Sequence, residues 1–252
     1  MFYFDPILID AMARGRLSRP GQLINLDMKI TYSIFSEKGP RRENQDFIQT
    51  IIDENKGRYT FVLCDGMGGH VHGGLAARIV ATSIARDIKR NPPLGEAGID
   101  AMISRAMWTL DTMAEVYGGA KMGTTMVMAY IEGDEMTVMH CGDSRCYVYD
   151  ADKNIKYVTI DHTSGDYMGA PITRCFFSGH PEKALPDFKT IKVAPGDRIL
   201  LCSDGVYPCM APDILRDRMM DDRQMEEIMD TFKFMCEKFS DDNYSAILVK
   251  ID

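Results

Sequence analysis

Alternating apolar and polar positions predict strands along most of the chain. Met28, Ile30, Tyr32 and Ile34 alternate with polar residues, and a period of two is typical of a strand with one buried face. Residues 47–52 and 58–64 predict two more strands, joined by the polar turn DENKG. Further strands are predicted over residues 124–131, 135–141, 145–149, 155–159, 189–193, 198–203 and 244–251.

Short polar turns between these strands predict hairpins. EGD joins the strands at 124–131 and 135–141, and DADKN joins those at 145–149 and 155–159. APGD predicts a third hairpin, from 189–193 and 198–203. Because hairpins pair neighbouring strands antiparallel, and regular strand–helix–strand alternation is missing, the pattern argues against a doubly wound parallel sheet.

Helical periodicity appears in the middle and near the end of the chain. Leu75, Ile79, Ile84 and Ile88 recur at steps of four and five residues, and a second apolar stripe runs from residue 99 to 113. A third helical region is predicted over 211–238. These elements predict an α+β layered sandwich with one core and one domain over 28–252. Residues 1–27 form an N-terminal leader of unknown role, without a regular period.

Composition and charge narrow the classes of protein. The 252 residues are 45% apolar and 26% charged, which excludes a disordered chain and a coiled coil. The formal charge of −8 argues against nucleic-acid binding, and no apolar run approaches the roughly 18 residues of a membrane span. The seven cysteines include no CxxC pair, which favours reduced, buried thiols. Because the N-terminus also lacks the cationic start of a signal peptide, we expect a cytoplasmic protein.

Acidic residues at strand ends are the strongest candidates for chemistry. Asp65 and Asp204 each follow an apolar strand and precede a glycine, while Asp143, Asp242 and Asp46 lie in similar places. One such Asp-Gly pair is usually a turn. Several carboxylates near a core repel one another unless a hard divalent cation offsets their charge, and oxygen ligands favour Mg²⁺ or Mn²⁺.

The glycine-rich segment GMGGHVHGG at 66–74 has two readings. It could bind an anion at a helix N-terminus, although it lacks the order of a P-loop. Its glycines better suit a backbone that passes close to a metal ion. His70 and His72 are either acid–base groups or solvated side chains.

Seven motifs in order resemble a known family, the metal-dependent protein phosphatases, also called type 2C Ser/Thr phosphatases, in their bacterial form. The resemblance runs from about Lys29 to Ile251. The motifs are RRENQD (41–46), FVLCDGMGGH (61–70), GTT (123–125), CGDSR (141–145), DHT (161–163), GDRILLCSDG (196–205) and DDNYSAILV (241–249). The resemblance implies a four-layer αββα sandwich, in which two antiparallel sheets are flanked by helices.

The resemblance also implies the role of each acid. Asp65 would bridge two Mn²⁺ or Mg²⁺ ions, and the Gly66 carbonyl would bind one of them. Asp204 and Asp242 would complete the first site, and Asp46 would hold the second ion through water. Asp143 would join Asp204 in a third, weaker metal site.

The implied reaction is hydrolysis of phosphoserine and phosphothreonine by a metal-bridging water, with Arg41 gripping the phosphate. The implied partners are phosphorylated proteins and a cognate Ser/Thr kinase, with no nucleic acid or membrane, and we expect a monomer. A regulator of the same fold that binds phosphoproteins without hydrolysing them is the alternative. Loss of a metal acid would favour that alternative, and all of the acids are present.

The sequence departs from the family pattern in three places. Met67 replaces a histidine that some relatives carry, so the general acid would be His70 or a metal-bound water. The flap over the site is short, and we expect residues 164–180 to form a compact loop pinned by Tyr167, Phe176 and Phe177. So short a flap predicts that both small aryl phosphates and flexible phosphopeptides are accepted. The leader 1–27 has no counterpart in the family pattern.

Overall fold

Two five-stranded antiparallel sheets form the centre of the molecule in a computed structural model, which describes residues 28–67, 72–92, 95–165, 167 and 169–252. The first sheet has the order β1 (Ile30–Glu37), β12 (Tyr244–Ile251), β11 (Arg198–Cys202), β7 (Arg145–Tyr149) and β8 (Ile155–Val158). The second has the order β10 (Asp187–Lys192), β6 (Glu135–Cys141), β5 (Met126–Glu132), β3 (Arg58–Asp65) and β2 (Asp46–Asp53). A small sheet pairs β4 (Gly123–Thr124) with β9 (Phe176–Phe177).

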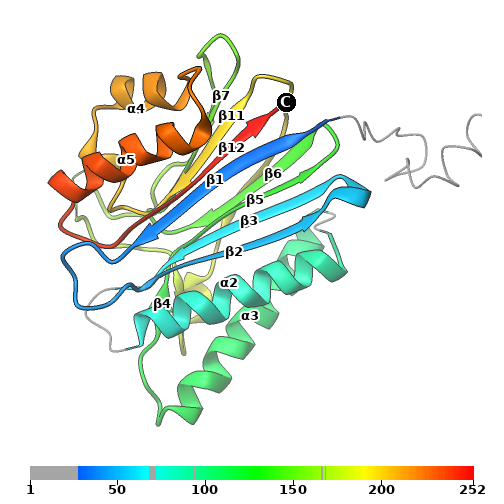
Figure 1. The fold of residues 1–252 in the computed structure, drawn as a ribbon. Coiled ribbons are helices and arrows are strands. Elements are labelled where there is room, and N and C mark those ends of the chain that lie inside the picture. Colours follow the sequence, from blue (N-terminus) through cyan, green and yellow to red (C-terminus); the bar gives the residue numbers. More distant parts are fainter. Residues whose placement is uncertain (1–27, 68–71, 93–94, 166, 168) are drawn as a thin grey trace, which may run out of the picture.

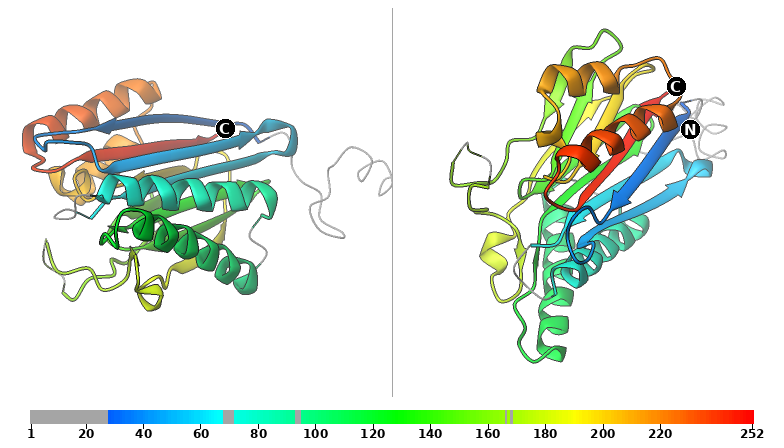
Figure 2. Two further views of the ribbon diagram at one scale, coloured as in Figure 1. Left: turned by 90° about the horizontal axis from the view of Figure 1, so that it is seen from below. Right: turned by 60° about the vertical axis from the view of Figure 1, so that its left-hand side comes forward.

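Helices cover the outer face of each large sheet (Figure 1). Helices α2 (Gly73–Arg90) and α3 (Glu96–Val116) lie on the second sheet, and α4 (Pro212–Met219) and α5 (Met225–Phe239) lie on the first. The view from below shows the layers from α5 through the two sheets to α2 and α3 (Figure 2, left). The predicted α+β sandwich of four layers is confirmed.

Alternation along the strands builds three apolar layers. In β3, Phe61 and Leu63 face the other sheet, while Val62 and Cys64 face the helices α2 and α3. All four side chains are fully buried, and burying one large apolar side chain stabilises the fold by about 1.5–3 kcal/mol. A third layer joins the first sheet to α4 and α5 through residues such as Leu248.

The hairpins predicted at EGD and DADKN form as β5–β6 and β7–β8, and DENKG joins β2 to β3. The hairpin predicted at APGD is wrong, because β10 pairs with β6 in one sheet and β11 pairs with β7 and β12 in the other. The APGD residues do form a turn, in which Gly196 has a φ of +91°. Val193 is buried between the sheets and the buried Asp197 pairs with Lys156 (2.5 Å), so the chain crosses from one sheet to the other.

The helical region predicted over 211–238 is two helices. Helix α4 ends at Met219, and the next helix begins at Met225. Between them, the Asp221 carboxylate accepts the Arg223 backbone N–H (3.1 Å), which favours a turn over a continuous helix. The leader 1–27 lies outside the described residues.

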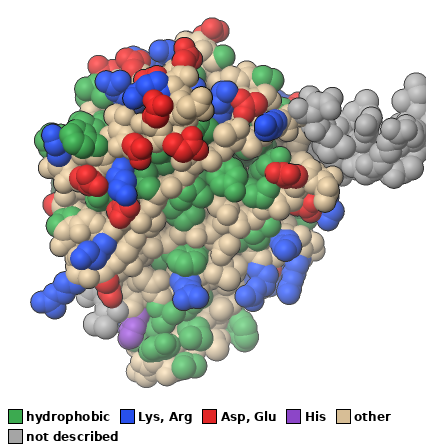
Figure 3. Space-filling view, in the orientation of Figure 1, with side chains coloured by type: hydrophobic (Ala, Val, Ile, Leu, Met, Phe, Trp, Pro, Cys, Tyr) green, Lys and Arg blue, Asp and Glu red, His purple; other side chains and the backbone are tan. Residues whose placement is uncertain are grey.

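The surface carries charged side chains of both signs, and the cysteines are buried. Acidic and basic side chains are interspersed over the face shown in Figure 3. None of the helices that could be described is long and apolar enough to span a bilayer. All seven cysteines are free and buried, as predicted.

Candidate functional site

Five aspartates meet at one end of the sandwich because neighbouring antiparallel strands begin and end there. Asp46 opens β2 and lies opposite Asp65, the last residue of β3. Asp204 follows β11, and Asp242 precedes β12, its neighbour in the first sheet. Asp143 lies in the turn between β6 and β7. Four of the five line one cavity of about 450 Å³, and Asp46 is buried behind it.

These carboxyl groups are hard to ionise together. Burial, followed by the charges of neighbouring aspartates, raises the pKa of Asp143 to about 7 and that of Asp65 well above its usual value. Burial raises the pKa of Asp46 and Asp204 to about 6, in each case against hydrogen bonds that favour the ionised form. The cluster therefore holds negative charge at neutral pH only at a cost that nearby cations would remove.

Two carboxylate oxygens in the cluster lack partners within the described part of the chain. Asp46 Oδ1 and Asp204 Oδ1 are buried and accept no hydrogen bond. A buried oxygen of this kind is costly unless something binds it. Because the donors are carboxylates and their unmet demand is for positive charge, the residues fit hard divalent cations such as Mg²⁺ or Mn²⁺.

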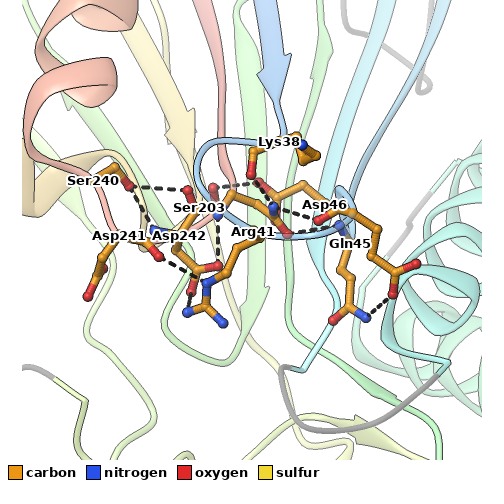
Figure 4. A network of polar contacts seen from close by, with 10 residues as sticks. Lys38, Arg41, Gln45, Asp46, Ser203, Ser240, Asp241 and Asp242 are labelled. Carbon is orange, nitrogen blue, oxygen red and sulfur yellow. Dashed lines mark hydrogen bonds and ion pairs between the residues drawn. The ribbon is translucent and has the colours of Figure 1, made fainter.

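Arg41 comes from the loop after β1 and turns toward the acids (Figure 4). Its guanidinium forms an ion pair with Asp242 (2.7 Å), and its Nε donates to the backbone carbonyl of Asp241 (2.9 Å). Arg41 and Arg42 both line the cavity. The structure thus brings the predicted phosphate-binding arginine to the predicted metal ligands.

Two polar residues that the sequence analysis did not single out support this end of the sandwich. Ser203 donates to Asp46 Oδ2 (2.9 Å) and so links the two sheets (Figure 4). Buried Asn243 donates to the carbonyls of Lys38 (2.6 Å) and Glu43 (2.9 Å) and holds the loop that carries Arg41. Their place beside a predicted acid at a strand end, Ser203 before Asp204 and Asn243 after Asp242, was the signal in the sequence.

The backbone of Asp65 and Gly66 is fixed by the GTT motif. The Thr124 hydroxyl donates to the Asp65 carbonyl (2.7 Å), and the Asp65 N–H donates to Thr125 Oγ1 (3.2 Å). A Cβ on Gly66 would lie 2.3 Å from the backbone carbon of Gly73. Only glycine therefore fits at this position, because the start of α2 packs directly against it.

A second pair of motifs is joined by an ion pair. Arg145 of CGDSR donates twice to Asp161 of DHT, at 2.9 and 2.8 Å, and its guanidinium stacks on the Tyr207 ring at 3.6 Å. This two-bond geometry suits arginine. The motifs themselves were visible in sequence, and their pairing was not.

The flap follows the prediction only in part. Residues 163–165 pair with residues 171–172, with the Ser164 N–H donating to the Pro171 carbonyl (2.9 Å) and Thr163 opposite Ile172. Phe176 is fully buried against α3 and β4, and Phe177 lies beside it in β9. The expectation that Tyr167 pins the loop is wrong, because its side chain is 66% exposed. The strand pairing of β9 provides the anchor instead.

Of the predicted acid–base candidates, His70 lies outside the described residues. His72 precedes α2, and its ring packs against Tyr117 (4.9 Å between centroids). Met67 lines the cavity.

A second group of potential ligands lies beside the site. Ligand atoms of His140, His162 and Asp187 fall within 4.8 Å of one another. The two imidazole rings are stacked at 4.4 Å, so their in-plane lone pairs do not converge. Arg174 already pairs with Asp187 (2.9 Å), and this arrangement suits a structural network better than a metal.

Comparisons with known proteins identify a family that this chain matches over most of its length. The family model described as "Protein phosphatase 2C" matches residues 41–251. Protein phosphatase PhpP of Streptococcus pneumoniae is 25% identical over 252 residues, covering 87% of this chain and 97% of the relative. The Ser/Thr protein phosphatase PstP of Mycobacterium tuberculosis is 27% identical over 201 residues, covering 73% of this chain and 38% of the relative.

Solved structures show the same fold. The catalytic domain of the phosphatase PstP, in complex with two manganese ions, superposes with a TM-score of 0.75 at 22% identity. The match covers 89% of this chain and 99% of that domain. The serine/threonine phosphatase of S. agalactiae gives a TM-score of 0.75 at 21% identity, covering 89% and 100% of the two chains.

Proposed function

The chain belongs to the protein phosphatase 2C family, and we propose that it is a metal-dependent protein Ser/Thr phosphatase whose active site is the aspartate cluster. The relatives that it matches are named as protein phosphatases, and one is named as a Ser/Thr phosphatase. The domain would span residues 28–252.

The observation that carries the proposal is the buried, unsatisfied negative charge. Asp46 Oδ1 and Asp204 Oδ1 have no partner in the described structure, and the pKa of Asp65 is raised well above its usual value. A chain that only bound phosphoproteins would gain nothing from acids that repel a phosphate. This observation favours the enzyme over the non-hydrolysing regulator.

Asp65, Asp204 and Asp242 would hold one Mn²⁺ or Mg²⁺ ion. Asp65 would also hold a second ion, with Asp46 acting through water, and the Gly66 carbonyl would bind one of the two ions. Asp143 and Asp204 would form a third, weaker site. When bound, such ions lower the pKa of a coordinated water toward neutrality and offset the charge of the phosphate. The relative PstP was crystallised with two manganese ions.

The protein side chains contribute to catalysis by positioning the phosphate and by offsetting its charge. Arg41 carries a planar guanidinium that can donate to two phosphate oxygens at once. It is held near the acids by the loop that Asn243 fixes. To bind phosphate it must exchange its present bond to Asp242 for bonds to the substrate.

The proton for the leaving alkoxide has no donor at position 67, because Met67 carries no acidic proton. His70 or water remains the prediction for this role. Substrates would be phosphorylated proteins, with a cognate Ser/Thr kinase as the opposing enzyme. We also propose that the enzyme is a cytoplasmic monomer.

Hydrolysis of p-nitrophenyl phosphate and of a phosphothreonine peptide tests the proposal. We expect both substrates to be hydrolysed with added Mn²⁺ or Mg²⁺, and neither after dialysis against EDTA. Activity should return when Mn²⁺ is restored. Full activity in the presence of EDTA, or no activity with any divalent ion, would contradict the proposal.

A further inference from the structure

An apolar groove lies between α3 and residues 181–188, apart from the aspartate cluster. The cavity has a volume of about 700 Å³. Trp108 on α3 is 70% exposed, and Leu185 and Phe188 on the opposite side are 56% and 41% exposed. Ile103 and Met107 line the floor. Large apolar side chains gathered in this way are typical of a binding surface.

Acidic side chains border the groove. Glu96, Asp100 and Asp111 follow one side of α3, and Asp187 lies on the opposite wall beside Arg174. Asp187 is neutralised by its ion pair with Arg174 (2.9 Å). Neither Glu96 nor Asp100 forms an ion pair with any other residue that the structure describes. The groove therefore favours a segment that is both apolar and basic.

The chain itself contains such a segment. Residues 11–19 of the leader read AMARGRLSR, with three arginines and no acidic residue. Met12 and Leu17 supply apolar side chains between or beside the arginines. An arginine can also stack on an exposed indole ring, as Trp108 offers.

The leader joins β1 at the end of the sandwich where the groove also begins. Strand β1 begins opposite Ile251 at the end of the sandwich where α2 ends and α3 begins (Figures 1 and 2). Glu96, at one end of the groove, is the first residue of α3. Residues 20–29 join Arg19 to β1, and at up to about 3.3 Å per residue these ten residues of extended chain span up to about 33 Å. A tether of this length gives an effective concentration near the millimolar range, so weak contacts are enough.

We propose that residues 11–19 dock in the groove between α3 and residues 181–188, with their arginines beside Glu96 and Asp100 and their apolar side chains against Trp108, Leu185 and Phe188. The occupant is thus the protein's own leader. This inference does not rest on the proposed function, because it concerns a different surface.

The single tryptophan of the chain provides the measurement, since Trp108 lies in the groove. Acrylamide quenching of its fluorescence would be compared in the full-length protein and in the full-length variant Arg14→Glu/Arg16→Glu/Arg19→Glu. We expect the wild-type quenching constant to be less than about half that of the variant, because a segment bound most of the time shields the ring most of the time. Hydrogen exchange should slow in residues 97–111 of the wild type alone.

Charge reversal on the groove gives the reciprocal test. Glu96→Lys/Asp100→Lys should expose Trp108 as the leader variant does, and combining both sets of changes should restore the shielding. The control Glu226→Lys/Glu227→Lys reverses two exposed acids at the start of α5 and should change nothing. Circular dichroism would confirm that each variant is folded.

Two results would overturn the proposal. Equal quenching in the wild type and the leader variant would show that the leader does not cover the groove. Shielding that grows with protein concentration, together with a doubled mass in light scattering, would show that a second copy occupies it.

Discussion

Single carboxylates in the cluster differ in their surroundings, and this difference makes their roles testable. Asp65 and Asp204 lie at the centre of the cluster, whereas the side chain of Asp241 is exposed. We expect Asp65→Asn or Asp204→Asn to lower kcat by more than about tenfold, which corresponds to 1.4 kcal/mol. Each variant should remain folded. Steady-state kinetics with Mn²⁺ and a thermal melt would measure this.

The matched control is Asp241→Asn, next to a proposed ligand and on the same loop. Its side chain is exposed, and Arg41 contacts only its backbone carbonyl. It should keep nearly full activity. If Asp65→Asn were as active as this control, the assignment of Asp65 would be incorrect.

The two neighbouring arginines should behave differently. Arg41→Ala removes the guanidinium that contacts Asp242 and faces the cavity. Charge-assisted hydrogen bonds contribute about 1.5–3 kcal/mol, so we expect KM to rise by about 10–100-fold. Arg42→Ala should change KM little. Reversed effects in the same kinetic assay would mean that Arg42 binds the phosphate.

The sequence indicated which acids the fold brings together, but it did not indicate the residues that hold them in place. An aspartate after an apolar strand is visible in sequence, because burial and charge conflict at that position. Asn243 was missed because its partners, Lys38 and Glu43, lie about 200 residues away in the chain. Ser203 was missed because serine at a strand end has no distinctive pattern.

At the scale of elements, His162 connects the turn between β6 and β7, the flap and strand β10. The His162 N–H donates to the Gly142 carbonyl (2.9 Å), and its Nδ1 accepts the Gly142 N–H (3.3 Å). Its carbonyl accepts from Thr173 in the flap, and its Nε2 contacts Asp187 at the start of β10 (3.1 Å). His162 therefore positions the turn that carries Asp143.

Substitution of His162 should weaken metal activation more than substrate binding. We expect His162→Ala to raise the Mn²⁺ concentration for half-maximal activity by about tenfold, as loss of buried hydrogen bonds worth 1–2 kcal/mol would do. KM for p-nitrophenyl phosphate should change much less. His162→Asn keeps an acceptor near Gly142 and should recover part of the effect.

His180→Asn is the control for this prediction, because His180 lies on the same segment and pairs only with exposed Glu182 among its polar side-chain contacts. It should leave Mn²⁺ activation unchanged. Equal effects of His162→Ala and His180→Asn would contradict the positioning role.

Strand pairing was predictable where it was local. A turn such as EGD specifies both a reversal and its partner, because the strands that flank it are the nearest available. The turn APGD specified that the chain reverses direction, but it did not specify which strands pair. The two strands that flank APGD each pair with a different strand, β10 with the free edge of β6 and β11 with the free edge of β7. These partners become available only when the two sheets assemble, so the turn sequence does not reveal them.

For the whole molecule, the raised carboxyl pKa values predict how stability depends on pH when divalent ions are removed. The pKa of Asp46 and Asp204 is raised to about 6 and that of Asp143 to about 7. Between about pH 4 and 7 the folded chain therefore binds more protons than the unfolded chain, and the free energy of unfolding falls as pH rises. Asp187 and Asp252 have lowered pKa values, so their effect falls below this window. Burial also lowers the pKa of His140, which acts in the opposite sense within the window, as one group against three aspartates.

We expect the Tm in EDTA to be higher at pH 5 than at pH 7.5 by more than about 4 °C, the shift that 1–2 kcal/mol produces in a chain of this size. Adding Mn²⁺ at pH 7.5 should raise the Tm, because ions that bind the folded state stabilise it. Differential scanning fluorimetry would measure both. A Tm in EDTA that rises from pH 5 to pH 7.5 would contradict the pKa assignments.

Strand β12 also has a consequence for biosynthesis. It is the last strand of the domain to be made, yet it lies between β1, the first, and β11 in the sheet. Until Ile251 has left the ribosome, β1 has no partner in its sheet, and pairing across so many residues is slow. Nascent chains stalled near residue 240 should therefore be digested by protease, whereas chains extended well past Ile251 should resist it. The enzyme would thus acquire Asp242 and its fold in the same late step, which keeps incomplete chains inactive.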